Sequence, residues 1–124
     1  MRLVVIAIAV ACFSATASWA NEEAVSWGFD LAKEHCARCH VIGEYNRMGG
    51  IDSTPSFPWM VRSDDFEERF STFYARRPHP VFVRVPGYAK WVEGTQYYPE
   101  FEMSHDEVEA IVEFARSLVG MKWP

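Results

Sequence analysis

The chain has 124 residues, of which 49% are hydrophobic, and this is enough for one domain with a modest core. Its 17 acidic and 12 basic residues give a formal net charge of −5, which argues against nucleic acid or an anionic membrane surface as a partner. Since no internal repeat, low-complexity tract or linker divides the sequence, we expect one domain.

The N-terminal segment has the pattern of a secretory signal peptide. Arg2 supplies a positive charge, residues 3–13 are an uncharged apolar run, and small residues precede a cleavage point before Asn21. The run is too short for a membrane-spanning helix, which needs roughly 20 apolar residues, although an uncleaved N-terminal anchor is the alternative. We therefore expect residues 1–20 to be removed on export to the periplasm, and residues 21–124 to form a mature domain without a stable membrane span.

The first element predicted after this segment is a helix over residues 22–40. Trp27, Leu31 and Ala32 recur at helical spacing, and Gly43 is a stop signal shortly afterwards. Two cysteines and a histidine would then lie at the C-terminal end of the helix.

Residues 36–40 read CARCH, which is the pattern of a covalent haem c attachment site. Two thiols at this spacing add to the two vinyl groups of the porphyrin, and the adjacent histidine is placed to bind the iron. Redox dithiols, half zinc sites and a disulfide share the spacing, but export disfavours the first two and a disulfide leaves His40 unexplained. We predict one covalent haem c per chain, with Cys36 and Cys39 as its anchors and His40 as the proximal iron ligand.

Three elements are expected in the middle of the chain. Residues 41–58 are rich in glycine and proline, which indicates a loop that passes one face of the haem. A helix is predicted between Ser63 as N-cap and Pro78, with acidic residues early and arginines late. Residues 78–99 should be mostly loop. The aromatic residues of the helix recur at helical spacing and predict a buried stripe: Phe66, Phe70, Phe73 and Tyr74.

The last predicted helix has the clearest start signal. Ser104 and Glu107 make a capping box, and Met103 with Val108 make a hydrophobic staple around it. The apolar face of the helix comprises Val108, Ile111, Val112, Ala115, Leu118 and Val119.

Taken together, these segments resemble the class I c-type cytochrome family. Residues 28–40 look like the family's N-terminal helix, in which Gly28 would permit close crossing by the C-terminal helix, with Phe114 as the aromatic that meets it. Pro55 begins a segment like the one whose backbone oxygen orients the haem-ligating histidine, and residues 99–104 look like the distal loop. The resemblance implies an all-α, small cytochrome c-like helical domain wrapped around one covalent haem.

The distal loop departs from the family pattern at the second iron ligand. Relatives place a methionine just before the proline of this loop, and Tyr98 stands there in this chain. Met103 carries a thioether and is our first candidate for the sixth iron position, although the staple also explains it. Tyr98 and His79, the latter in a Pro-His-Pro frame, are the other candidates, and an open position is a further option.

The occupant of the sixth iron position distinguishes two possible functions. An iron with two strong protein ligands suits electron transfer, and an open iron binds gases or peroxide. We expect a periplasmic monohaem c-type cytochrome that mediates one-electron transfer between periplasmic redox proteins and is not an enzyme. The alternative is a haem-based gas- or peroxide-binding or sensing protein with an open or weakly ligated distal site.

Overall fold

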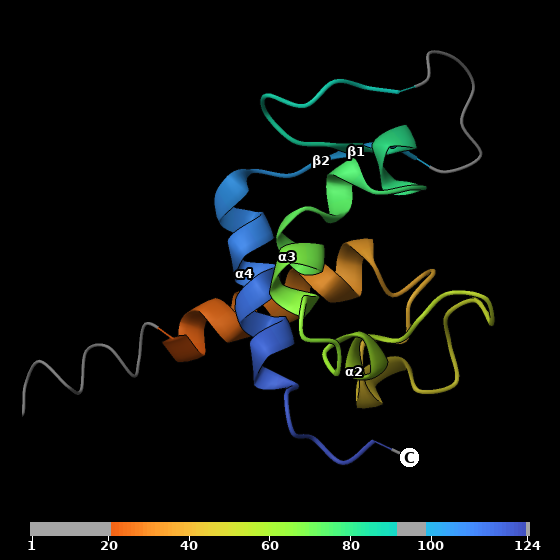
Figure 1. Cartoon of the computed structure of the whole chain (residues 1–124), viewed down its shortest axis with the longest axis vertical. Helices are drawn as coiled ribbons and strands as arrows, with labels where there is room; N and C mark the ends of the chain where they lie inside the picture. The colour runs from red at the N-terminus through yellow and green to blue at the C-terminus, as the bar shows by residue number, and fades with distance from the viewer. Residues whose placement is uncertain (1–20, 92–98, 124) are drawn as a thin grey trace, which may run out of the picture.

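The computed structural model describes residues 21–91 and 99–123 (Figure 1). The predicted signal peptide and Tyr98 lie outside these described residues. None of the described helices is long and apolar enough to cross a membrane. The elements in chain order are an N-terminal helix over residues 21–35, η1 (Glu44–Asn46), α2 (Phe57–Met60), α3 (Phe66–Ser71), η2 (Phe73–Ala75), η3 (His79–Val81), β1 (Val83–Arg84), β2 (Phe101–Glu102) and α4 (His105–Ser117). This mostly helical architecture confirms the predicted fold class.

The N-terminal helix crosses α4 at Gly28, which is buried. A Cβ atom at this position would lie 1.9 Å from the carbonyl oxygen of Ala110 and 3.0 Å from the Cβ atom of Phe114. Beside the crossing, the ring of Phe29 contacts that of Phe114, with centroids 5.2 Å apart. Glycine therefore allows the two helices to approach at backbone distance, as the resemblance implies.

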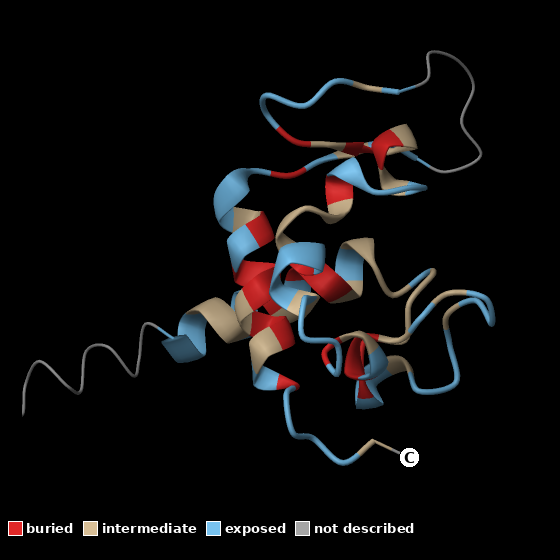
Figure 2. Cartoon of the chain, in the orientation of Figure 1, coloured by how far each residue is buried: buried red, intermediate tan, exposed pale blue. Residues whose placement is uncertain are grey.

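Helix α3 also packs against α4, and the residues of the predicted aromatic stripe lie in or against the same core. Phe70 and Tyr74 are buried, and Phe66 and Phe73 are half-buried against the same core. The ring of Phe57, from α2, meets Phe70 edge-on at 4.8 Å. Figure 2 shows the buried positions gathered where α3, α4 and the N-terminal helix come together.

Helix α3 is shorter than the sequence predicted. Its N-cap is Asp65 rather than Ser63, whose hydroxyl donates instead to the Asp65 carboxylate. At the other end, the hydroxyls of Ser71 and Thr72 donate to the carbonyl oxygen of Glu68 at 3.2 and 2.6 Å. Such local hydrogen bonds compete with the helical pattern, and the chain leaves α3 there.

A short pair of parallel strands was not predicted, because two residues per strand give no sequence signal. In this pair, β1 of Val83–Arg84 lies in register with β2 of Phe101–Glu102. The carboxylate of Glu100 forms ion pairs with Arg84 at 2.9 Å and with Lys90 at 2.6 Å beside the strands. The segment that follows His79 is thereby joined to the segment that leads into α4.

The start of α4 is as predicted, and its end is not. Ser104 and Glu107 form both hydrogen bonds of the capping box, and the predicted apolar positions from Val108 to Leu118 are buried. Val119 was placed on the buried face, but it is 54% exposed. The reason is that α4 ends at Ser117 and the chain turns away through Gly120, which has a φ of 79°.

Candidate functional site

The CARCH segment forms a turn at the C-terminal end of the N-terminal helix. The sequence predicted a helix as far as His40, but the helix ends at residue 35 and residues 36–40 turn back. The carbonyl oxygen of Cys36 accepts hydrogen bonds from the backbone N–H groups of Cys39 at 3.0 Å and His40 at 2.9 Å. Both cysteines carry free thiols. The turn thus brings two thiols and an imidazole to one end of the helix.

Asn46 clamps this turn with both ends of its side chain. Its Nδ2 donates to the carbonyl oxygens of Ala37 at 3.1 Å and His40 at 2.8 Å, and its Oδ1 accepts from the N–H of Ile42 at 2.8 Å. This residue could not be predicted from the sequence, because an asparagine in a glycine-rich loop carries no motif that distinguishes it from an ordinary turn residue.

The clamp leads to a stability prediction. We expect Asn46→Ala to lower the free energy of unfolding by about 1–3 kcal/mol, because it leaves partly buried backbone groups without their partners. Urea unfolding of the haem-loaded protein, followed by circular dichroism, measures the change. Glu44→Ala, an exposed change in the same loop, is the matched control and should stay within about 0.5 kcal/mol of the parent. Equal effects of the two substitutions would contradict the clamp.

A hydrogen bond to the backbone of Pro55 holds the imidazole of His40 in place. Nδ1 of His40 lies 2.7 Å from the carbonyl oxygen of Pro55, and because a carbonyl can only accept, Nδ1 carries the proton. The ring of Phe57 meets the imidazole edge-on at 5.6 Å. Burial lowers the pKa of His40, with the Pro55 hydrogen bond acting in the opposite direction. The imidazole is held neutral, with the lone pair of Nε2 available to a metal.

A second histidine, His79, lies beside the first. Its ring is parallel to that of His40 within 7°, and the two ring centroids are 6.1 Å apart. Nδ1 of His79 donates to the carbonyl oxygen of Arg76 at 3.0 Å. The rings of Phe73 and Phe82 flank it at 5.2 and 5.8 Å. The fold therefore brings together two imidazoles that are far apart in the sequence.

The other two candidates for the distal position are placed differently. Met103 is 2% exposed in the hydrophobic core, and its backbone N–H donates to the carbonyl oxygen of Arg84 at 2.8 Å. Tyr98 is outside the described residues. Of the three candidates, His79 is the residue whose ring the structure sets against that of His40.

The donor set fits a covalent haem better than a redox dithiol. Burial, followed by the proximity of Cys39, raises the pKa of the Cys36 thiol to about 12. A redox-active dithiol needs an attacking thiol with a lowered pKa, so this pair is poorly suited to disulfide exchange. Two thiols and a neutral histidine at one helix end are the groups that hold a haem c.

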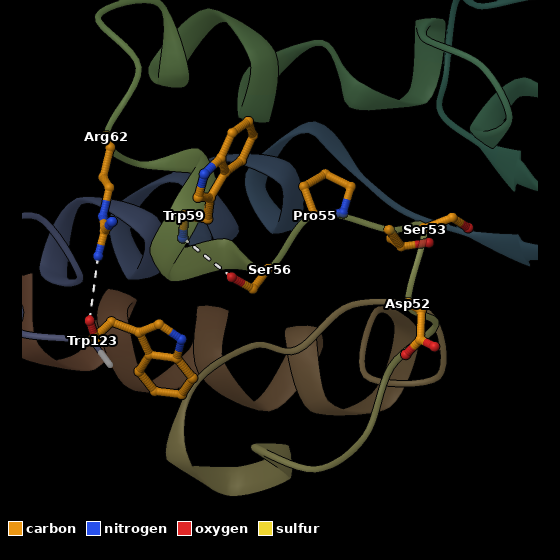
Figure 3. Close-up of a pocket in the computed structure, with 8 residues that line it drawn as sticks. Asp52, Ser53, Pro55, Ser56, Trp59, Arg62 and Trp123 are labelled. Atoms are coloured by element: carbon orange, nitrogen blue, oxygen red, sulfur yellow. Dashed lines mark hydrogen bonds between the residues drawn. The ribbon is translucent and has the colours of Figure 1, made fainter.

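An open cleft of about 640 Å³ lies along the segment that contains Pro55 (Figure 3). Trp59 and Trp123 lie on its two sides, and the guanidinium of Arg62 donates to the carbonyl oxygen of Trp123 at 3.4 Å. None of the cysteines and histidines described above lines this cleft. Pro55, which accepts the hydrogen bond from His40, is the residue that the two regions have in common. The cleft is therefore a feature of the outer surface rather than of the histidine pair.

Comparison with known proteins gives a match to cytochrome c-552 of Bradyrhizobium diazoefficiens. The two sequences are 34% identical over 86 residues, which cover 69% of this chain and 79% of that protein. No family model matches the chain, and no solved structure matches it.

Proposed function

Since the chain belongs to the class I c-type cytochrome family, we propose that it is a periplasmic monohaem cytochrome that carries single electrons between redox proteins. The observation that carries the proposal is the turn at residues 36–40. It presents two free thiols and a histidine whose Nδ1 is held by the carbonyl oxygen of Pro55. The relative that matches 69% of this chain is named a cytochrome, which agrees with a role of the turn in holding a haem.

Each of these residues has a defined role in the proposal. Cys36 and Cys39 would tether the haem, each thiol adding across a vinyl group with sulfur on one carbon and hydrogen on the other, so that no oxidant is consumed. His40 would donate Nε2 to the iron. The carbonyl of Pro55 keeps the proton on Nδ1, fixes the orientation of the ring and raises the basicity of Nε2. When bound, the haem would supply a one-electron iron couple.

The alternative function, binding of gas or peroxide, requires an accessible iron. The ring of His79 lies parallel to that of His40, with the centroids 6.1 Å apart, and the rings of Phe73 and Phe82 contact it. This arrangement favours an occupied distal position and therefore a carrier.

The test is a full-length protein expressed with a haem-attachment system and purified from the periplasm. We expect a mass increase of one haem per chain, haem staining that survives a denaturing gel, and a reversible redox titration that fits one electron. A chain without bound haem would contradict the attachment. A covalent haem whose reduced form takes up carbon monoxide readily would support the alternative function.

The periplasmic location and the predicted leader have a separate test. If residues 1–20 are the signal peptide, the N-terminal sequence of the purified protein begins at Asn21. A purified chain that still begins at Met1 would contradict cleavage, and recovery of that chain in the membrane fraction would support an N-terminal anchor.

A further inference from the structure

We propose that His79 is the second axial ligand of the haem iron, so that the metal is held between His40 and His79 rather than between a histidine and a methionine. The inference rests on the proposed haem attachment at Cys36 and Cys39. It gives this chain a ligand set that differs from the His/Met pair of its family and goes beyond what the comparison with a relative shows.

The spacing of the two rings is the first argument. Imidazole nitrogens bind first-row metals such as zinc at about 2.0–2.1 Å, so two imidazoles on opposite sides of one metal have ring centres roughly 6 Å apart. The centroids of His40 and His79 are 6.1 Å apart, and their planes differ by 7°. Both the distance and the nearly parallel planes therefore agree with two imidazoles on opposite sides of one metal.

The hydrogen bonds of the two rings are the second argument. Nδ1 of His40 donates to the carbonyl oxygen of Pro55, and Nδ1 of His79 donates to that of Arg76. In both rings the proton is thus on Nδ1 and the lone pair on Nε2. A metal-binding histidine commonly has its second nitrogen bound to a carbonyl or carboxylate in this way, which sets both its tautomer and its orientation.

The surroundings of His79 hold its ring in place before any metal arrives. The residue begins the short helix η3, lies between Pro78 and Pro80, and has a backbone N–H that donates to Arg76 at 3.0 Å. An imidazole held in this way has little conformational entropy left to lose on binding.

Met103 is the competing ligand, and its position has a sufficient structural explanation. It is 2% exposed and belongs, with Val108, to the core cluster, and it stands directly before the capping box of α4, at the position of a hydrophobic staple. The ring that lies parallel to that of His40, with its centroid 6.1 Å away, belongs to His79. The structure therefore gives a reason for the burial of Met103 that does not involve the iron.

The experiment compares the haem-loaded, full-length parent with His79→Ala, His79→Met and the matched control Met103→Leu. We expect the ferric parent to give a low-spin electron paramagnetic resonance signal, and the ferrous parent to exclude carbon monoxide. His79→Ala should lose the low-spin signal and bind carbon monoxide, and added imidazole should restore the signal. His79→Met should raise the midpoint potential, because a methionine ligand stabilises the ferrous state. Met103→Leu should leave the spectra unchanged.

The opposite pattern would overturn the inference: a low-spin signal that survives in His79→Ala and disappears in Met103→Leu. Near-infrared magnetic circular dichroism of the parent distinguishes two nitrogen ligands from a nitrogen and a sulfur ligand. It therefore decides the question even if a variant fails to fold. Haem staining on a denaturing gel reports the thioether bonds alone, so failure of the attachment is seen separately from failure of the His79 ligation.

Discussion

Replacing both Cys36 and Cys39 by serine is expected to abolish covalent haem attachment completely. The two thiols are the groups at the turn that can form thioethers, and the backbone hydrogen bonds to the Cys36 carbonyl do not depend on the sulfur atoms. Serine is close in size to cysteine, so the turn itself should persist while the covalent bonds are lost. Haem staining on a denaturing gel should fall to background, and the mass should equal that of the polypeptide alone.

The single variants and a third cysteine provide the controls. Cys36→Ser or Cys39→Ser alone should leave one vinyl group unreacted, which shifts the reduced absorption band to longer wavelength. Cys12 lies in the predicted signal peptide, so Cys12→Ser should leave the haem content of the mature protein unchanged. Haem that remains attached to the double variant after denaturation would refute the assignment of Cys36 and Cys39.

Gly28→Ala should destabilise the folded protein by roughly 1–3 kcal/mol or more, the usual range for overpacking a close contact. The new Cβ atom would lie 1.9 Å from the oxygen and 2.5 Å from the carbon of the Ala110 carbonyl. Both are backbone atoms, so no rotation of a side chain can relieve the clash, and the N-terminal helix must move away from α4. Since the helix carries the CARCH turn at its end, the displacement would also disturb the haem attachment segment.

Intrinsic helix propensity predicts the opposite sign, which makes the substitution a sharp test. Alanine is favoured over glycine inside a helix by about 0.8–1.0 kcal/mol, so without the crossing the variant would be more stable than the parent. Ser26→Ala, an exposed change on the same helix, should be neutral or slightly stabilising. Urea unfolding of all three proteins in the haem-loaded state gives the comparison, and a stabilised Gly28→Ala variant would rule out the close crossing.

The features that could be predicted from the sequence depend on neighbouring residues. The capping box involves Ser104 and Glu107 within one helical turn, and the structure contains both of its hydrogen bonds. The aromatic stripe of α3 and η2 follows from spacings of three and four residues, and its members pack in the core. In each case the physical cause of the structure lies within a few positions along the chain.

The features that could not be predicted depend on segments that meet only in the fold. Asn46 holds the CARCH turn through contacts that no motif announces. The sequence offered Met103, Tyr98 and His79 as comparable distal ligands, because residue type alone does not say which side chain reaches His40. The early end of α3 has a local cause, but serine and threonine are compatible with either a helix or a cap, and residue type alone does not distinguish the two.

The parallel pairing of β1 with β2 has a consequence for how this protein can diverge. It joins Val83 to Phe101 across the base of the intervening residues 85–100, close to the segment that carries His79. The entropy of closing a loop grows slowly with its length, by about 0.6 kcal/mol for each doubling. Insertions between the two strands are therefore inexpensive, and they leave the paired base in register. Descendants of one ancestor could acquire different surfaces in this region and recognise different partners, while the paired strands stay in place.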